Sequence, residues 1–582
     1  MSRAPSRVGD AGHQLGDAGD QWWRSAVVYQ IYPRSFADSD GDGVGDLNGI
    51  TERLDHLAGL GVDVLWLSPV YPSPQDDNGY DISDYRGIDP TFGSLEDFDR
   101  LLTGLHERGI RLVMDLVVNH TSDEHPWFVE SRSSTDSPLR NWYWWRPPRE
   151  GHAAGSPGAE PTNWESFFSG PTWEYDDQTD EYYLHLFTRK QPDLNWENPE
   201  VRQAVYGLMT WWLDRGVDGF RMDVINLISK DVSLPDGKTR DGRTLGNGAP
   251  YYTDGPRVHE YLAEMHREVF APRGSTYLRI AETPGTTTEH AVLYTAPERG
   301  EVDMVFGFEH VNIDHGVTKW DVQPLDLVAL KESMDRWQQA LATTGWNSLY
   351  WDNHDQPRVV SRFGDDGHYR VESAKLLGTV LHLHRGTPYI YQGEELGMAN
   401  VEFSSIDQLR DVESLNHFAH AVAEGADPEQ VMAGIRAMGR DNARTPMQWD
   451  DSQHAGFTSG SPWIEANADH VEVNAAAQVD DPESVYSHYG RLIALRHDDP
   501  VVVSGDFVML APEHPRLYAF TRTLDGRSLL VVANFSGDEL TLDHPDLPSQ
   551  GKLSMVLGNY GDDGSGHPDV LRPWEARVLR SA

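Results

Sequence analysis

Eight short apolar segments, each followed by an amphipathic stretch or a long excursion, dominate the sequence from Trp22 onward. We expect these segments to be strands at 27–36, 62–70, 110–120, 217–223, 276–282, 302–308, 347–355 and 388–395. Stretches with helical periodicity lie between them, among them 50–61, 95–109, 199–216, 368–386 and 484–497. Strand–helix alternation favours a parallel sheet in an α/β fold, and eight repeats are the number that closes a (β/α)8 TIM barrel.

Two regions depart from this alternation. Residues 119–195, after the third strand, are rich in Trp, Pro, Gly and Ser and show no helical period, which predicts an inserted subdomain B. Residues from 504 onward alternate polar and apolar positions between Gly/Asp turns, which is typical of antiparallel strands. We therefore expect a polar N-terminal arm (1–21), a barrel (22–118 and 196–503), the insertion (119–195) and a C-terminal antiparallel β-sandwich domain (504–582).

Composition excludes several classes of function. Asp and Glu number 92 against 48 Lys and Arg, for a net charge of −44, so the phosphates of a nucleic acid would be repelled. The chain has no Cys, which removes disulfides, thiol catalysis and thiolate metal sites. No apolar run is long enough for a membrane span, and the N-terminus lacks the apolar core of a secretion signal. We expect a cytoplasmic protein with neither nucleic-acid nor membrane partners, and its oligomeric state stays open.

Polar residues gather where the predicted strands end. Asp115 and Asn119–His120 lie at the end of the third strand, Arg221 and Asp223 end the fourth, Glu282 ends the fifth, and His354 and Asp355 end the seventh. In a barrel of this kind the chemistry lies at the carboxyl ends of the strands, so Asp223, Glu282 and Asp355 should converge at one mouth. A single Asp in such a place is usually a helix cap or a surface acid. The whole set at equivalent positions favours a site.

Cleavage of a glycosidic bond is the chemistry that suits clustered carboxylates without a permanent cation. It needs one carboxylate and one carboxylic acid on either side of an oxocarbenium-like centre. An adjacent Arg keeps one carboxylate ionised, while a crowded or apolar environment raises the pKa of another so that it can donate a proton. The abundant aromatic residues of the insertion suit stacking on sugar rings, although packing explains most of them.

Six motifs give the sequence a specific resemblance. These are DLVVNH (115–120), GFRMDV (219–224), AETPG (281–285), NHDQPR (353–358), QPDLNWENPEV (191–201) and GTPYIYQGEELGM (386–398). They resemble the signature regions of glycoside hydrolase family 13, the α-amylase family, and in particular its oligo-1,6-glucosidase, α-glucosidase and dextran glucosidase group. The resemblance implies a retaining, exo-acting glucosidase that releases glucose from the non-reducing ends of short oligosaccharides. Ala281 replaces an expected Gly but leaves the following carboxyl in place.

The resemblance also implies a role for each site residue. Asp223 would be the nucleophile, Glu282 the general acid/base, and Asp355 the carboxylate that fixes the sugar hydroxyls, while Arg221 orients Asp223. The remaining contacts to the glucose would come from His120 and His354 in the −1 site, Tyr80 beneath the ring, and Asp81 with Arg440 at the non-reducing end.

Val224, which directly follows the proposed nucleophile, bears on linkage specificity. In the resembled group Val at this position accompanies a preference for α-1,6 links, whereas Ala or Thr accompanies a preference for maltose. An α-1,6 link has one more rotatable bond, which lets the second sugar swing past a branched side chain. We expect α-1,6 oligosaccharides to be preferred. The alternative is that Val224 merely packs behind the fourth strand.

The segment DSDGDGVGD (38–46) predicts a cation site. Asp38, Asp40, Asp42 and Asp46, with the carbonyl of Val44, offer hard oxygen ligands at alternate positions of a loop. Gly49 stands where an EF-hand has Glu, and a strand precedes the loop, so an EF-hand switch is not expected. The resemblance places a structural Ca²⁺ here. No zinc spacing appears, and we expect no organic cofactor.

Several alternatives remain open. Some relatives have lost their catalytic acids and serve as non-catalytic partners of membrane transporters, but Asp223, Glu282 and Asp355 are all present here. Within enzymes, the rivals are a maltose-preferring α-1,4-glucosidase, a transglucosylase, and an isomerase acting on sucrose or trehalose.

Overall fold

A computed structural model describes residues 21–581 apart from 241, 275, 549–552 and 562–566. The predicted N-terminal arm, residues 1–21, therefore lies outside the described residues except for Gln21. Among the described residues, no helix has both the length and the apolar character needed to cross a bilayer.

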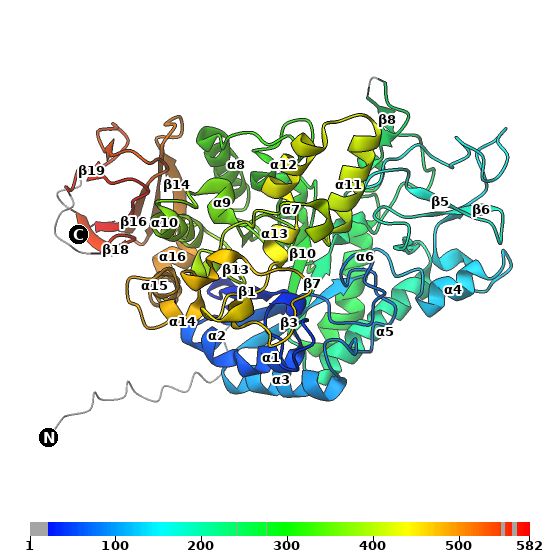
Figure 1. The fold of residues 1–582 in the computed structure, drawn as a ribbon, viewed down its shortest axis with the longest axis horizontal. Coiled ribbons are helices and arrows are strands. Elements are labelled where there is room, and N and C mark those ends of the chain that lie inside the picture. Colours follow the sequence, from blue (N-terminus) through cyan, green and yellow to red (C-terminus); the bar gives the residue numbers. More distant parts are fainter. Residues whose placement is uncertain (1–20, 241, 275, 549–552, 562–566, 582) are drawn as a thin grey trace.

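Eight parallel strands form the central sheet, in the order β11-β10-β7-β3-β2-β1-β13-β12 (Figure 1). A parallel bridge between Val305 and Asn347 joins the two ends of this order and closes the barrel. The predicted α/β barrel is therefore confirmed. The strands are Val28–Ile31 (β1), Val64–Leu67 (β2), Arg111–Val117 (β3), Gly219–Asp223 (β7), Leu278–Glu282 (β10), Met304–Phe306 (β11), Ser348–Leu349 (β12) and Thr387–Tyr391 (β13).

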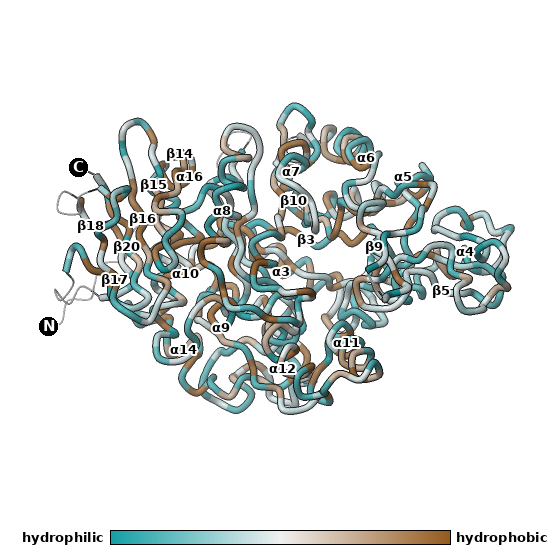
Figure 2. Tube along the Cα trace, turned by 90° about the horizontal axis from the view of Figure 1, so that it is seen from above, coloured by the Kyte–Doolittle hydropathy of each residue, from teal (hydrophilic) through white to brown (hydrophobic). Residues whose placement is uncertain are grey.

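Burial explains why the barrel strands read as continuous apolar runs. Every residue of β1, β2, β7 and β13 is buried, because one face of each strand lines the barrel interior and the other packs against helices. Figure 2 shows the same distribution, with hydrophobic segments in the middle of the molecule and hydrophilic ones around it.

Helices surround the barrel, and their ends follow the local sequence. The main ones are Leu47–Glu52 (α1), Leu54–Leu60 (α2), Leu95–Glu107 (α3), Pro199–Arg215 (α5), Val258–Met265 (α6), Thr288–Thr295 (α7), Leu327–Ala340 (α8), Arg370–Leu383 (α10) and Val485–Asp498 (α15). Ser94 and Asp97 form a capping box at the start of α3, and α5 ends at Gly216 in the left-handed conformation, with φ of 111°. The single helix predicted over 50–61 is two helices that meet at Arg53.

The insertion after β3 contains a three-stranded antiparallel sheet. Its strands are Trp145–Arg146 (β4), Trp173–Asp176 (β5) and Glu181–Leu184 (β6), and a helix, Pro126–Arg132 (α4), precedes them. The sequence analysis did not predict α4, since seven residues are too few to show a helical period. In Figure 1 this region extends from the barrel on the side opposite the C-terminal domain.

The loop after β7 completes the core of the insertion. Leu227, Leu234 and Tyr252 of this loop pack with Trp164 and Trp173 in one buried cluster. The same loop contributes the short strands Lys238–Thr239 (β8) and Gly246–Asn247 (β9). The insertion and the loop after β7 therefore share one core, although they come from different β/α units.

Two further helices, Val412–Ala423 (α11) and Pro428–Met438 (α12), lie side by side in the excursion that follows β13 (Figure 1). Asp411 caps α11 through the backbone N–H groups of Glu413 and Ser414. Glu413, in the first turn of α11, lines the same cavity as the last residues of β7 and β10.

The C-terminal region forms two antiparallel sheets. The larger has the order β14-β15-β16-β20-β18, with strands Asp506–Leu510, Leu517–Leu524, Arg527–Asn534, Ala576–Ser581 and Leu553–Gly558; the smaller pairs Leu540–Thr541 (β17) with Val570–Leu571 (β19). Leu517 and Ala519 pack toward β17 and β19, whereas Tyr518 and Phe520 pack against the main core. This alternation buries both faces of β15, as in a sandwich.

Candidate active site

A cavity of about 360 Å³ lies where the carboxyl ends of the barrel strands meet, and both the barrel and the insertion line it. Asp223 is the last residue of β7 and Glu282 the last residue of β10. Seven residues that the sequence analysis singled out line this cavity: Tyr80, His120, Asp223, Val224, Glu282, Asp355 and Arg440. Asp77, which was not singled out, lines it as well. The structure thus brings the three predicted catalytic carboxylates to one place.

Arg221 holds three carboxylates together beneath the cavity. Its Nη1 donates to Asp115 Oδ1 at 2.9 Å and to Asp223 Oδ1 at 2.6 Å, and its Nη2 forms an ion pair with Glu282. The guanidinium is buried and lies over the ring of Trp66. Because Asp223 and Glu282 contact the same guanidinium, their carboxylates lie close together.

The shared burial also sets the protonation of these acids. Burial raises the pKa of Glu282 above its usual value, while the charge of Arg221 opposes the rise. Burial raises the pKa of Asp223 as well, again against Arg221. Two neighbouring carboxyl groups with raised pKa values favour a state in which one proton is bound by the pair. Such a pair can supply an acid and a carboxylate at the same time.

Asp355 has the opposite environment. Arg444 Nη2 donates to its Oδ1 at 2.9 Å, Arg440 Nη1 donates to the same atom at 3.2 Å, and His354 Nε2 lies 3.1 Å from Oδ2. Burial alone would raise the pKa of Asp355, but His354, Arg440 and Arg444 hold it well below its usual range. Asp355 is therefore ionised in the pH range in which Asp223 and Glu282 still hold a proton between them.

The two predicted glucose-binding histidines are fixed by amide donors. Gln30 Nε2 lies 2.9 Å from Nδ1 of His354, and since an amide nitrogen can only donate, Nε2 of His354 carries the proton that faces Asp355. His120 has an amide nitrogen beside each ring nitrogen: Asn119 Nδ2 lies 3.2 Å from Nδ1, and Gln191 Nε2 lies 3.2 Å from Nε2, which is also 3.1 Å from the carbonyl of Tyr80. Burial lowers the pKa of His120 to about 4, so it is neutral near pH 7.

Tyr80 lines the cavity as predicted. Its ring stacks on the ring of His354, with centroids 5.0 Å apart and planes 7° apart, and its hydroxyl donates to Asp115 Oδ2 at 3.0 Å. Trp66 Nε1 donates to the same oxygen. Tyr80 is therefore rigid and presents a fixed aromatic surface to the cavity.

Asp81 does not lie where the sequence analysis expected it. Its buried carboxylate accepts hydrogen bonds from Ser73 Oγ and from the backbone N–H groups of Asp76 and Asp77, and it does not line the cavity. Asp77 occupies the expected place, with Oδ1 3.0 Å from Arg440 Nη2. The loop 76–81 turns back on itself around Asp81, so the acid four residues earlier faces the cavity. Asp77, rather than Asp81, is thus among the acids that pair with Arg440.

The sequence analysis also missed several charged residues around Arg440. Arg444 lies one helical turn after Arg440, at the end of the short helix Asp441–Arg444 (α13), and both contact Asp355. Their i, i+4 spacing was a signal that could have revealed Arg444. Asp411 binds Arg440 Nε at 2.8 Å, and Glu413 with Lys319 lines the cavity. Sequence separation of 29 residues hides the first of these contacts, and no motif marks the second.

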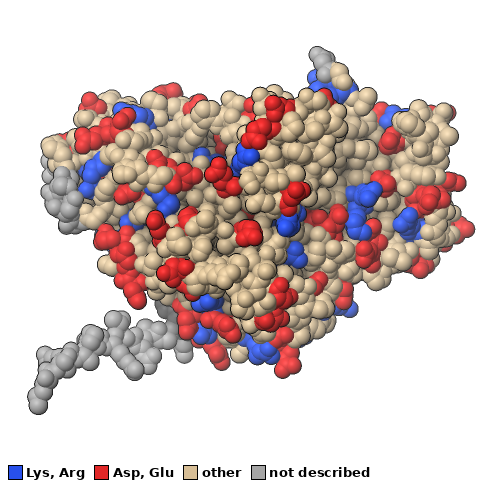
Figure 3. Space-filling view, viewed as in Figure 1, with Lys and Arg blue, Asp and Glu red and all other residues tan. Residues whose placement is uncertain are grey.

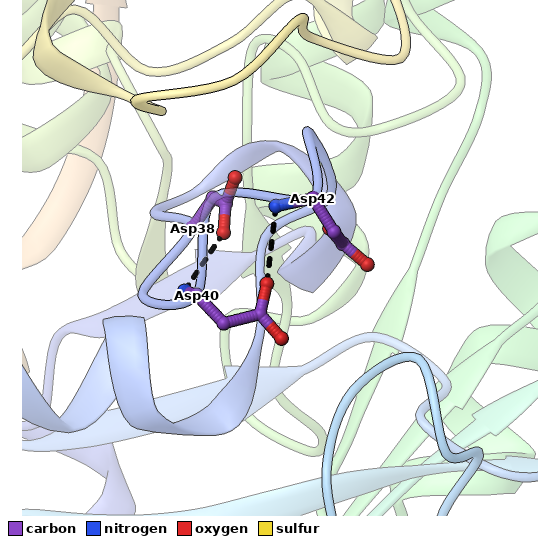
Figure 4. Close-up of side chains that lie close together, drawn as sticks. All are labelled: Asp38, Asp40 and Asp42. Atoms are coloured by element: carbon purple, nitrogen blue, oxygen red, sulfur yellow. Dashed lines mark hydrogen bonds between the residues drawn. The ribbon is translucent and has the colours of Figure 1, made fainter.

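The acidic loop after β1 brings together three of its four aspartates. Carboxylate oxygens of Asp38, Asp40 and Asp42 lie within 4.8 Å of one another (Figure 4). Asp38 accepts from the N–H groups of Gly41 and Gly43, whose φ values of 85° and 95° suit glycine. Asp46 instead caps α1 and binds Ser39, so the predicted ligand set is only partly gathered. The role of the Val44 carbonyl as a ligand stays a prediction.

Comparisons with known proteins agree with this arrangement. The family model "Alpha amylase, catalytic domain" matches residues 30–505. The chain is 56% identical over 563 residues to an oligo-1,6-glucosidase of Parageobacillus thermoglucosidasius, covering 96% of this chain and 99% of that protein. It is 49% identical to a trehalose-6-phosphate hydrolase of Bacillus subtilis strain 168, with 96% and 98% covered. The crystal structure of a trehalulose synthase from Pseudomonas mesoacidophila MX-45 superposes with a TM-score of 0.90 at 42% identity, covering 97% of this chain and all of that one.

Proposed function

Because the chain belongs to the α-amylase family of glycoside hydrolases, we propose that it is a retaining, exo-acting α-glucosidase that prefers α-1,6 links in short oligosaccharides. One observation carries this proposal: Asp223 and Glu282 both contact Arg221 at the floor of a cavity that Asp77 and Arg440 close on one side. Retention requires two carboxyl groups about 5–5.5 Å apart, and a shared guanidinium favours that short spacing.

The proposed reaction has two displacements. In the first, Asp223 attacks the anomeric carbon while Glu282 donates its proton to the departing oxygen, so that the glycosidic bond breaks and a glucosyl ester forms. In the second, Glu282 takes a proton from water, whose oxygen attacks the same carbon and releases Asp223. The raised pKa of Glu282 suits the first step, and the contact of Asp223 with Arg221 supports its role as the carboxylate.

Exo action fits a cavity with one closed end. Asp77, Arg440 and Asp411 form an ion-paired wall, with Arg440 in the middle. A volume of about 360 Å³ is at the small end for ligand sites, which suits a terminal glucose with one neighbouring sugar. A long polysaccharide would have to cross the wall to be cut internally.

Linkage preference follows from the similarity to oligo-1,6-glucosidases and from Val224, which lines the cavity beside Asp223. Proteins named trehalose-6-phosphate hydrolase, palatinase and trehalulose synthase are also similar over nearly the whole chain. The same fold therefore supports rival substrates, and only product analysis separates them.

The test is to incubate the enzyme with isomaltose, maltose, sucrose and trehalose and to identify the products. We expect glucose from isomaltose at the highest kcat/KM, with Asp223→Ala as the inactive control. Accumulation of a new disaccharide from sucrose or trehalose, without glucose, would instead identify an isomerase. Preference for maltose would leave the assignment to α-glucosidases unchanged but would overturn the assignment of linkage.

A structural Ca²⁺ in the loop 38–46 is part of the proposal. Calcium prefers several hard oxygen ligands, and the carboxylates of Asp38, Asp40 and Asp42 supply them. Asp46 would support this site from outside, as the cap of α1. The ion would hold the loop, away from the reacting carbon. A cytoplasmic location stays a prediction of the sequence analysis.

A further inference from the structure

The lining of the cavity contains an ion pair that the proposed mechanism does not use. Lys319, in the loop after β11, and Glu413, in the first turn of α11, both line the cavity, and their side chains form an ion pair. Each side chain is mostly buried, with 22% and 16% exposed. These two residues come from elements 94 positions apart, so the pair ties α11 to the barrel loop at the cavity wall.

Charge in the cavity is strongly unbalanced. The described lining residues include five carboxylates, Asp77, Asp223, Glu282, Asp355 and Glu413, against two cations, Lys319 and Arg440. Arg440 is bound by Asp77, Asp355 and Asp411. Among the described lining residues, Lys319 is thus the one cation not bound to Asp77, Asp355 or Asp411. Glu413 neutralises Lys319 and also lies 3.5 Å from Nε of Arg440.

A phosphorylated sugar would require the opposite arrangement. A phosphate group carries nearly two negative charges and needs a cation when it leaves water for a partly buried site. With Lys319 paired to Glu413 and Arg440 paired to several acids, the described lining of this cavity offers the phosphate no unpaired cation. Several aromatic residues, Phe167, Phe187 and Phe308, supply the rest of the wall. Such a surface suits the apolar faces and hydroxyls of an uncharged sugar.

We infer that Glu413 is a specificity-determining residue that restricts the enzyme to uncharged glucosides by neutralising Lys319. This inference rests on the proposed function and deepens it, because overall similarity alone does not separate neutral from phosphorylated substrates: relatives named for trehalose 6-phosphate match the chain almost as fully as oligo-1,6-glucosidases do. Removal of the Glu413 charge should convert Lys319 into a phosphate-binding group.

The test compares glucose 6-phosphate with glucose as inhibitors of isomaltose hydrolysis. In the wild type, glucose 6-phosphate should inhibit more weakly than glucose. In Glu413→Gln, the ratio of the two inhibition constants should shift toward glucose 6-phosphate by about tenfold or more, and the shift should shrink as NaCl is raised. The double variant Glu413→Gln/Lys319→Gln should lose the gain, because no cation remains to bind the phosphate.

The matched control is Glu429→Gln on the neighbouring helix α12. Glu429 is 75% exposed and pairs with Arg436, so this variant makes the same change in net charge away from the cavity. An unchanged ratio in Glu413→Gln, or an equal shift in Glu429→Gln, would overturn the inference. Glu413 also lies 3.5 Å from Nε of Arg440, and the double variant separates the two cations. A gain that persists after Lys319 is replaced would assign the effect to Arg440 and overturn the inference.

Failure of the proposed function would look different. In that case the wild type would hydrolyse no neutral glucoside, whatever residue occupies position 413. Direct calorimetric binding of glucose 6-phosphate to the wild type and the three variants would then still test Glu413. Equal affinity in the wild type and Glu413→Gln would contradict its role.

Discussion

The backbone N–H of Val224 donates a hydrogen bond of 3.0 Å to Oε2 of Glu282, across the neighbouring strands β7 and β10. Val224 makes this bond from the left-handed region, at φ 36° and ψ 39°, where a β-branched residue is rare and strained by about 1–3 kcal/mol. Its side chain packs with Trp144 and Trp173 of the insertion. The insertion therefore supports the backbone that positions the proposed acid.

Substitution of Val224 should change linkage preference. Val224→Ala and Val224→Thr remove or replace methyl groups at the cavity wall, so we expect kcat/KM for maltose to rise relative to isomaltose. One or two methyl groups correspond to about 10- to 200-fold in discrimination. Measurement of both substrates in all three proteins checks this. Equal losses on both substrates would mean that Val224 only packs behind β7.

The pH profile should reflect Glu282. Because burial raises its pKa, the protonated acid persists to higher pH than in an exposed Glu, and activity is lost as pH rises through that raised pKa. Glu282→Gln cannot titrate, so it should lower kcat/KM by about 10²- to 10⁴-fold and remove the alkaline limb from the residual activity. An alkaline limb that persists in this variant would assign the limb to another group.

Calcium should stabilise the fold more than it assists the reaction. Binding to the folded state alone raises stability by mass action, so a chelator should lower Tm, and added Ca²⁺ should restore it. In Asp38→Ala the Ca²⁺-dependent shift should disappear, whereas Asp55→Ala, which changes an exposed acid, should keep it. A wild-type Tm that responds to neither chelator nor Ca²⁺ would argue against an ion in this loop.

Salt should not inhibit the enzyme. Acidic side chains outnumber basic ones over the face in Figure 3, as expected for a net charge of −44. Ionic strength near 1 M shortens the Debye length to about 3 Å and so screens their mutual repulsion. We expect Tm to hold or rise between low salt and about 1 M NaCl, with kcat maintained. Loss of activity at modest salt would indicate that the acidity is not an adaptation to salt.

The barrel and the meeting of Asp223 and Glu282 at its carboxyl end were predictable because two independent patterns coincide. Buried parallel strands leave continuous apolar runs, and Asp223 and Glu282 end such runs, so the sequence indicates both the strand and its functional end. Asp115, Asn119 and His120 follow the same rule in and after β3.

Loop geometry was not predictable in the same way. Asp77 and Asp81 lie on either side of Gly79, and the sequence does not show which of the two faces the cavity. The turn that buries Asp81 leaves Asp77 at the cavity. The position of Asp46 fits both a calcium-loop ligand and a helix N-cap, and in the structure Asp46 is the N-cap of α1. Thr458 contacts Asp38 from 420 residues away, a contact that no local pattern encodes. Long-range packing, rather than propensity, determines these details.

The configuration of the first glucose released from isomaltose tests the central claim most directly. If Asp223 forms a glucosyl ester on the face opposite the departing sugar, and water then attacks from the face that this sugar left, NMR at early times will show α-glucose before mutarotation. Asp223→Ala should release none while keeping the wild-type Tm within a few degrees, since this carboxylate lies at a strand end in the cavity. β-Glucose as the first product would contradict the double displacement and the assignment of Asp223 as nucleophile.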